Sequence, residues 1–430
     1  MARLPLQGIR VVDLCVIFAG PFATWLLASM GAEVIRVDSI QHWPDQGRAF
    51  ALWPTPEMLQ GLGGTTLPGR KPGEKPWNRN AIFTRVAWNK LSCCIDLTSP
   101  QGKEVFKKLI AVSDVFIENN GADVMEHLEL GHDVLMKVNP GLICINMPSY
   151  GRTGPYKSYV GWGDNAEALA GHNWLRGYPD ENHPLHNTPV FHMDSSGGVL
   201  AAFAAIMALR HRQRTGRGQW IDFAQIESVF PQLAEAYMDY AWNGRNQRTI
   251  GNHHPSAFQG CYRCRGQYRW VNITINSDEE WQHFCSAIGN PPWTEDERFS
   301  DVLSRYKNHD ELDRLIEEWT SQHDNFEVFY IMQRHGVPAG PVEDHRDAYM
   351  DPQLNARDFF QVISQADIGT YRYPGFLWKM SETPCSYRLP PCRLGEHNDY
   401  VFREVIGLSE EEITRLQEEK IIGGERYLWA

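Results

Sequence analysis

The opening strand–helix–strand unit constrains the fold of this chain more than any other feature. Residues 9–14 form a short apolar strand pattern, and the turn Ala19-Gly20-Pro21 leads into an apolar helix predicted over 22–30. Gly31 ends that helix, and residues 33–38 give the next strand. Two strands joined by one short helix pair in parallel. The alternation continues, so we predict an α/β fold with a doubly wound, Rossmann-like parallel sheet.

The rest of the chain predicts a second, smaller lobe. Residues 41–80 are rich in Pro, Gly and Trp and are expected to form an irregular insertion. Residues 195–211 give an apolar helix of small side chains, of the kind that packs tightly in a core. The predicted boundaries are a large domain over 1–214 and 345–430, a linker over 215–238, a small α+β domain over 239–314, and a returning linker over 315–344.

Composition excludes several classes of function. The formal net charge of −12 argues against nucleic-acid binding, which selects basic surfaces. The nine cysteines lack framework spacing, and the isolated pair Cys261-x-x-Cys264 is a weak metal signal, so we expect reduced thiols and no metal site. No apolar run approaches the roughly 20 residues of a membrane span. With a strand predicted almost at once and no signal peptide expected, these features predict a cytoplasmic protein.

A dinucleotide site is the first ligand hypothesis that the opening unit raises, with Asp38 as the ribose ligand. The turn Ala19-Gly20-Pro21 lacks the three-glycine spacing that seats a pyrophosphate on the helix. Helix N-termini still attract anions, so another phosphate-bearing ligand stays open.

Short motifs in a fixed order carry a family resemblance over most of the chain. They are Gly8-Ile-Arg-Val-Val-Asp-Leu14, Ala19-Gly-Pro21, Gly31-Ala-Glu-Val-Ile35, Asn89-Lys90, Ser113-Asp-Val-Phe-Ile-Glu-Asn119, Leu130-Gly131, Asn139-Pro140, Thr215-Gly-Arg-Gly-Gln219, Gly336-Val-Pro-Ala-Gly-Pro341 and Leu394-Gly-Glu-His397. In these motifs the chain resembles the class III coenzyme A-transferases of CaiB/BaiF type, whose relatives include formyl-CoA transferase and acyl-CoA racemases. The resemblance implies a ring-shaped protomer in an interlocked homodimer. It also implies coenzyme A (CoA) and acyl-CoA as substrates, with no tightly bound cofactor.

The resemblance implies a catalytic aspartate in a Gly-x-x-Asp setting after an Ala-Gly step. Here Ala170-Gly171 is followed by Gly177-Tyr178-Pro179-Asp180, which makes Asp180 the expected nucleophile. A carboxylate can attack an acyl-CoA, form an anhydride and then carry CoA as an aspartyl thioester. Local sequence alone favours a turn residue at this place.

Gly163-Asp164 bears on the choice between transfer and racemisation. The resemblance places a His-Asp pair here in the racemases, whereas this chain has Gly163 in place of the histidine. Two-base epimerisation has then lost one base, unless His172 or His192 replaces it. CoA transfer is preferred. A racemase or isomerase, a nicotinamide-dependent dehydrogenase and a non-catalytic CoA-binding protein stay open as alternatives, and Asp164 itself reads as a helix cap.

The resemblance also implies which residues contact CoA. Carried over one by one, these are Phe18, Ala19, Asn119, Asn120, His127 and Tyr150. Pro148, His127 and Thr98 stand where relatives have basic residues, so Arg36, Arg79 and Arg152 are candidate replacements at the phosphates. The aromatic residues near the expected nucleophile suit a flat or apolar acid, or a quaternary ammonium acid, and the sequence names no single acid.

Overall fold

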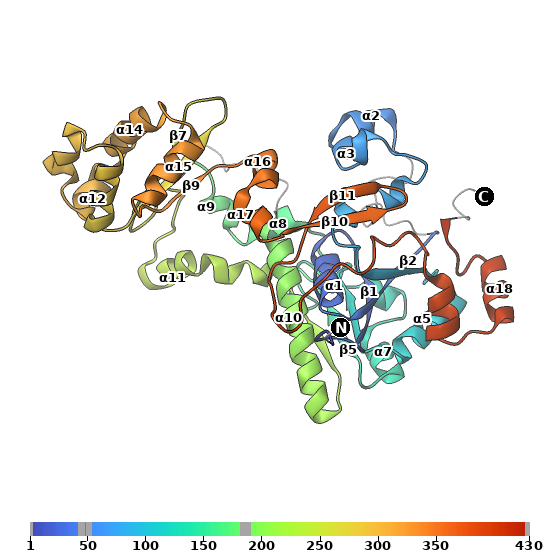
Figure 1. The fold of residues 1–430 in the computed structure, drawn as a ribbon. Helices are drawn as coiled ribbons and strands as arrows, with labels where there is room; N and C mark the ends of the chain where they lie inside the picture. Colours follow the sequence, from blue (N-terminus) through green and yellow to red (C-terminus); the bar gives the residue numbers. More distant parts are fainter. Residues whose placement is uncertain (1–2, 42–47, 49–53, 181–190, 426–430) are drawn as a thin grey trace. The chain divides into compact units, whose positions relative to one another are not determined.

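The computed structural model describes residues 3–41, 48, 54–180 and 191–425, and its chain divides into two compact units. Of the described residues, the first unit comprises those up to His172, residues 191–238 and residues 358–425. The second unit comprises residues 173–180 and 239–357. Each unit is described by itself below (Figure 1).

A six-stranded parallel sheet forms the centre of the first unit. The strand order is β3-β2-β1-β4-β5-β6, the doubly wound order of a Rossmann-like fold. This confirms the predicted fold class. The strands are β1 (Arg10–Leu14), β2 (Glu33–Asp38), β3 (Lys90–Cys94), β4 (Val115–Glu118), β5 (Ile143–Asn146) and β6 (Gln219–Asp222). Because β6 pairs with β5, the residues predicted as a linker over 215–238 contribute a strand to this sheet.

Both faces of the sheet are buried, because neighbouring residues along each strand point to opposite sides. Val11 packs in the cluster beneath α1 (Ala19–Ser29) and α10 (His192–Thr215). Val12 packs in the other cluster, beneath α5 (Pro100–Ala111). The remaining helices of this unit are α2 (Pro56–Gln60), α3 (Leu62–Thr65), α4 (Ala81–Thr84), α6 (Val124–His127), α7 (His132–Val138), α8 (Gly163–Leu169) and α18 (Glu410–Glu418).

Helix α1 begins earlier than the sequence predicts. It starts at Ala19, so Pro21 lies inside its first turn, where a missing N–H breaks no helical hydrogen bond. Helix α10 likewise begins at His192, ahead of the expected start at 195. The two helices touch closely at Gly198, where an added Cβ would lie 2.8 Å from the carbonyl oxygen of Ala19. This contact places the second turn of α10 against the start of α1, which follows the loop after β1.

Helix α10 is the only described helix long and apolar enough to cross a membrane, and 44% of its most apolar stretch is buried in the protein. That is weak support for a span, because a core helix has the same length and composition. A two-stranded hairpin, β10 (Phe360–Gln365) and β11 (Gly369–Pro374), completes the unit. The final helix starts with the predicted capping box, in which Ser409 accepts from the Glu412 amide. The insertion over 41–80 lies partly outside the described residues.

The second unit is built on an antiparallel sheet in the order β7-β8-β9, with β7 (Phe258–Arg263), β8 (Trp270–Ile275) and β9 (Ala339–Pro341). Its core joins these strands to amphipathic helices. They are α12 (Asp278–Ala287), α13 (Val302–Lys307), α14 (His309–Thr320) and α15 (Asn325–Arg334), with α16 (His345–Met350) and α17 (Pro352–Ala356) following and α9 (His172–Leu175) and α11 (Ala234–Asn243) at the unit boundaries. Residues 315–344, expected as a linker, therefore belong to this core.

Candidate active site

A cavity of about 340 Å³ opens at the carboxyl ends of β1 to β4 in the first unit. The strand order reverses there, because β1 lies between β2 and β4. Open parallel sheets bind ligands at such a switch point. Among the residues expected to contact CoA, Asn120 and His127 line the cavity, and so does Arg36, one of the candidate replacements.

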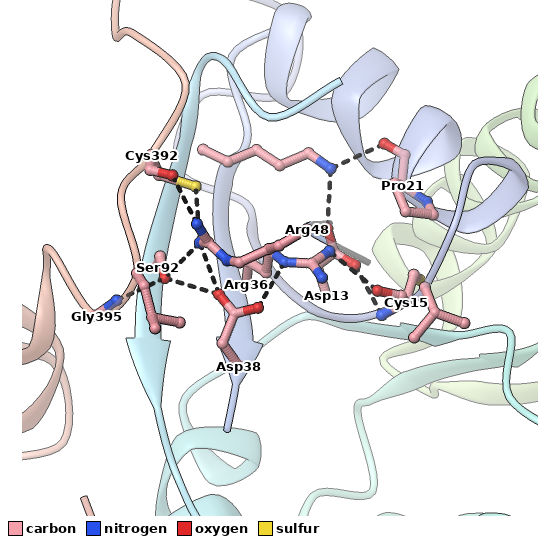
Figure 2. Close-up of polar contacts among 12 residues, drawn as sticks. Asp13, Cys15, Pro21, Arg36, Asp38, Arg48, Ser92, Cys392 and Gly395 are labelled. Atoms are coloured by element: carbon pink, nitrogen blue, oxygen red, sulfur yellow. Dashed lines mark hydrogen bonds and ion pairs between the residues drawn. The ribbon is translucent and has the colours of Figure 1, made fainter. Parts of the chain in front are cut away.

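A buried network of ion pairs lies beside this cavity (Figure 2). Lys90 Nζ is 2.9 Å from Asp13 Oδ2. Arg36 Nε is 3.0 Å from Asp38 Oδ1, and Arg48 Nη2 is 2.8 Å from Asp38 Oδ2. All five side chains are buried. Two acidic side chains thus face three basic ones.

Burial by itself would raise the pKa of Asp38, but the guanidinium groups of Arg48 and Arg36 outweigh it and lower that pKa to about 2. Likewise burial would raise the pKa of Asp13, and Lys90 and Arg36 lower it overall. Both carboxylates are therefore ionised near neutral pH, and the network keeps one positive charge in excess. Asp38 is fully engaged by the two arginines and Ser92, so it does not serve as the ribose ligand of a dinucleotide.

Asn119 and Asn120 hold the loops around the cavity in place. The carboxamide of Asn119 accepts from the Val16 amide at 2.7 Å and donates to the Val16 carbonyl at 3.0 Å. Asn120 Nδ2 donates to the Leu14 carbonyl and to Glu118. Both predicted residues thus connect the end of β4 to the loop after β1. Their carboxamide groups therefore shape the site by holding the backbone around Leu14 and Val16 in place.

Phe18 and Ala19 begin helix α1 at the carboxyl end of β1. Ala19 is buried, and Phe18 is half-buried and stacks on Phe22. The guanidinium carbon of Arg85 lies 3.9 Å from the centre of the Phe18 ring, a cation–π contact. Arg85 is partly desolvated, which lowers the pKa of its guanidinium, while the negative charge of Asp194 acts in the opposite direction. The sequence analysis missed this arginine.

Asp194 lies in the first turn of α10, the helix that touches Ala19 through Gly198. Burial raises the pKa of Asp194, the nearby carboxylate of Glu167 raises it further, and Arg85 opposes both, leaving the pKa at about 6. A carboxyl group with a strongly raised pKa beside a cation is typical of catalytic acids, bases and nucleophiles. Asp194 therefore has the electrostatic environment expected of a nucleophilic carboxylate, the role that the family resemblance implies for Asp180.

Glu167 holds this first turn in position. It is fully buried on α8, and its Oε1 accepts from the Met193 amide at 2.9 Å. Its Oε2 lies 2.9 Å from Nδ1 of His172, and the ring of His172 meets His192 edge to face. Both histidines considered as replacement bases therefore lie near the start of α10, and Nδ1 of His172 is engaged by Glu167.

Asp180 is the nucleophile that the family resemblance implies. It is exposed, in a turn that is grouped with the second unit. That segment is fixed by the Thr249 hydroxyl, which donates to the Gly177 carbonyl, and by Trp174 Nε1, which donates to the Gln247 carbonyl at 2.8 Å. These contacts describe an ordered turn.

Gly163 and Asp164 open helix α8. Gly163 is buried, and an added Cβ would lie 2.8 Å from Cβ of Phe191, so packing excludes a histidine at this place. Asp164 is exposed in the first helical turn. The imidazole that the racemases carry here has no room in this fold.

The other predicted contacts are placed as follows. Tyr150 is half-buried, and its ring packs on the backbone of Gly161, where an added Cβ would lie 2.4 Å from the hydroxyl. Arg152 pairs with Glu126 in the segment before β5, and Arg79 donates to the carbonyls of Asp367 and Pro68. The structure thus leaves Arg36 as the candidate replacement that lines the cavity.

One sequence signal could have found Asp194. It opens a helix whose buried side is almost all Gly and Ala, a pattern that predicts close packing against a neighbouring helix. The apolar helix after β1 is the natural neighbour, and it carries Phe18 and Ala19. An acidic residue at such a crossing meets the predicted CoA loop. The contributions of Glu167 and Arg85 depend on tertiary packing and have no comparable signal.

Comparison with protein families places the chain among known sequences. The family described as CoA-transferase family III matches residues 6–398. Succinyl-CoA–D-citramalate CoA-transferase of Chloroflexus aurantiacus is 30% identical over 424 residues, covering 97% of this chain and 98% of the relative. The beta subunit of succinyl-CoA–L-malate CoA-transferase from the same organism is 32% identical over 428 residues, covering 97% and 98%.

Further relatives agree in length and fold. Succinate–glutarate CoA-transferase of Agrobacterium fabrum is 30% identical over 405 residues, covering 93% of this chain and 96% of the relative. The crystal structure of a CaiB/BaiF family protein from Brucella suis superposes with a TM-score of 0.79 at 27% identity, covering 94% of this chain and all of the other.

Proposed function

Because this chain belongs to CoA-transferase family III and transfers coenzyme A to a carboxylic acid, we propose that the transfer passes through Asp194. The observation that carries the proposal is the half-buried carboxyl group of Asp194, whose desolvation and proximity to Glu167 raise its pKa to about 6, so that it is ionised at neutral pH but more basic than an exposed aspartate. Greater basicity makes a carboxylate a stronger nucleophile. Asp180, exposed and in a turn, is the rival assignment.

The reaction balances without a metal or a redox partner. An Asp194 oxygen attacks the thioester carbonyl, the C–S bond breaks, and CoA leaves as a thiolate. The thiolate attacks the aspartyl carbonyl of the mixed anhydride and releases the donor acid as a carboxylate. The acceptor carboxylate then attacks the aspartyl thioester, which expels CoA thiolate and forms a second mixed anhydride. The thiolate attacks the acceptor's carbonyl in that anhydride, which gives the new acyl-CoA and releases Asp194 as a carboxylate.

The anionic end of CoA is assigned to the cavity at the sheet edge. The excess positive charge of the Asp13, Lys90, Arg36, Asp38 and Arg48 network supports this placement, because an anion stabilises a buried cluster in which cations outnumber carboxylates. His127 lines the same cavity. Ala19, whose carbonyl lies against Gly198 of α10, and Phe18, which carries Arg85 over its ring, are then assigned to the path from the cavity to Asp194.

Succinyl-CoA is the proposed donor, with a short dicarboxylic acid as acceptor. The relatives named for succinyl-CoA, malate, citramalate and glutarate support this class. Arg85 supports it on physical grounds, because a guanidinium near the nucleophile can pair with the distal carboxylate of a dicarboxylic acid. We expect Arg85→Gln to raise KM for a dicarboxylate at least about tenfold and to change KM for a monocarboxylate of equal length far less. Equal changes for both acids would contradict this role.

A homodimer is proposed for the whole protein, with the interlocked arrangement that the family resemblance implies. Helix α10 exposes apolar side chains on its outer side, including Phe203 at 58% and Met207 at 54% exposure. Apolar surface of this kind marks an interaction site.

Variants at three aspartates test the nucleophile. We expect Asp194→Asn to reduce the CoA-transfer rate from succinyl-CoA at least about 10³-fold, because a carboxamide is a poor nucleophile. Asp180→Asn tests the rival, and Asp164→Asn is the matched control on an exposed helix turn. Both should keep the rate within about threefold of the parent. An active Asp194→Asn enzyme or an inactive Asp180→Asn enzyme would overturn the assignment.

A further inference from the structure

Two histidines and an aspartate meet in the second unit, and none of them takes part in the chemistry proposed above. They are His253, His309 and Asp313, and their candidate ligand atoms all lie within 4.8 Å of one another. None of the three belongs to a motif that the family resemblance uses. His253 belongs to the segment Gly251-Asn-His-His-Pro255.

The backbone brings the three groups together in a simple way. His309 and Asp313 are four residues apart on α14, so they share one face of that helix. His253 comes from the loop before β7, where its amide donates to the Ile250 carbonyl. Its Nε2 lies 3.0 Å from Asp313 Oδ2, and Nδ1 of His309 lies 3.1 Å from the same oxygen. The two imidazole rings stack at 3.6 Å between centroids.

The surroundings hold the carboxylate in one orientation. The Tyr262 hydroxyl, buried in the core, donates to Asp313 Oδ1 at 2.7 Å. That bond leaves Oδ2 facing the two imidazoles. Hydrogen bonds to the far side of a ligand are the usual way in which proteins orient metal-binding groups. The ring of Phe258 packs on His309 and fixes its plane.

The buried ring of His309 has only one of its two nitrogens in a hydrogen bond within the described part of the chain. It is 7% exposed, and its Nε2 has no hydrogen-bond partner among the described residues. A cavity of about 440 Å³ is lined by His253 and His309, and by Asp310 and Glu311 at the start of α14. A small cation in this cavity can therefore reach His253 and His309, and Asp313 Oδ2 lies within 3.1 Å of a ring nitrogen of each.

We propose that His253, His309 and Asp313 form a binding site for a divalent transition-metal ion of the Zn²⁺ class. Two imidazoles and one carboxylate suit this class, and three protein ligands leave a fourth position for water. With bonds of about 2.0–2.1 Å, neighbouring ligands of a tetrahedral ion lie roughly 3.3 Å apart. The observed separations of 3.0 and 3.1 Å need little rearrangement. The ion would tie the loop before β7 to α14 and is independent of CoA transfer.

Cobalt substitution tests the site directly. The untagged full-length protein is stripped with a chelator and titrated with Co²⁺, and visible absorption reports four-coordinate binding. Zn²⁺ is then added in competition, and bound metal is counted by mass spectrometry after gel filtration. We expect one ion per chain and displacement of Co²⁺ by Zn²⁺.

His253→Gln is the main variant, because His253 is partly exposed and its loss leaves the core intact. We expect it to weaken Co²⁺ binding more than about tenfold. Asp313→Asn should do the same, and His283→Gln, an exposed histidine on α12, should bind as the parent does. Circular dichroism and CoA transfer confirm that each variant is folded. A parent without stoichiometric binding, or unchanged binding in both His253→Gln and Asp313→Asn, would overturn the proposal.

Discussion

At the scale of single residues, burial decides which aspartate is chemically distinct. Asp194 is desolvated beside Glu167, and Arg85 opposes only part of the effect, so its pKa rises to about 6. Asp180 is exposed in a turn. The family resemblance implies Asp180 through a Gly-x-x-Asp motif after an Ala-Gly step, whereas the pKa of Asp194 depends on burial, on Glu167 of α8 and on Arg85. The residues next to Asp194 in the sequence do not indicate that Glu167 and Arg85 lie near it.

The pH dependence of catalysis follows from that pKa. Attack requires the ionised carboxylate, so kcat/KM should fall as pH drops through about 6 and decrease about tenfold per unit at lower pH. A stopped assay between pH 4.5 and 8.5 measures this limb. A profile that stays flat from pH 7 down to pH 5 would contradict the assignment.

The same pKa has an opposite consequence for stability. The folded state binds the Asp194 proton more tightly than the unfolded chain, whose aspartates titrate near about 3.9, so the favourable contribution exists below about pH 4 and is lost as pH rises through about 6. Asp194→Asn should therefore be more stable than the parent at pH 8, by at most about 3 kcal/mol, and equal to it at pH 4. Denaturant unfolding at the two pH values measures the difference. A variant less stable than the parent at pH 8 would indicate a purely structural aspartate.

At the scale of elements, the parallel sheet could be predicted because its signals are local. Residues 9–14 and 33–38 are apolar runs joined by one helix, and the capping box at Ser409 needs only four residues. The predicted linker over 315–344 was wrong for a non-local reason. Helix α15 packs on the antiparallel strands β8 and β9. The core that joins these elements to β7 forms only when segments distant in the sequence come together.

The ion-pair network beside the cavity is also non-local. Arg48 connects the insertion to β2 through Asp38, to β3 through Ser92, and to the C-terminal segment through the Cys392 carbonyl. We expect Arg48→Met to lower the free energy of unfolding by about 3 kcal/mol, because it leaves buried Asp38 with one cation fewer. Arg314→Met, which breaks an exposed pair with Glu311, should lower the free energy of unfolding far less, because exposed ion pairs contribute little to stability. Denaturant titration compares the two. Equal costs would mean that the network does not tether the insertion.

At the scale of the whole molecule, the family resemblance is confirmed by the match over residues 6–398. The arrangement of two copies depends on surfaces rather than on motifs. The proposed interlocked dimer makes a kinetic prediction, because threaded rings separate only when one chain unfolds.

Subunit exchange measures this property. Tagged and untagged homodimers, each of about twice 49.2 kDa, are mixed under native conditions and sampled over days by native mass spectrometry. We expect no mixed dimer until the sample is unfolded and refolded. Mixed dimers that form within hours at native conditions would indicate an ordinary docked dimer, and a mass of one chain would contradict dimerisation.

The central claim, that Asp194 carries the transferred groups, is tested most directly by locating the covalent intermediate. The protein is incubated with succinyl-CoA, trapped with hydroxylamine and digested with trypsin. Asp180 and Asp194 fall on one tryptic peptide, over residues 177–210, so fragment ions between them must assign the modified residue. The account predicts a hydroxamate at Asp194 that is lost in Asp194→Asn and kept in Asp180→Asn. A hydroxamate at Asp180, or at any other carboxylate, would contradict it.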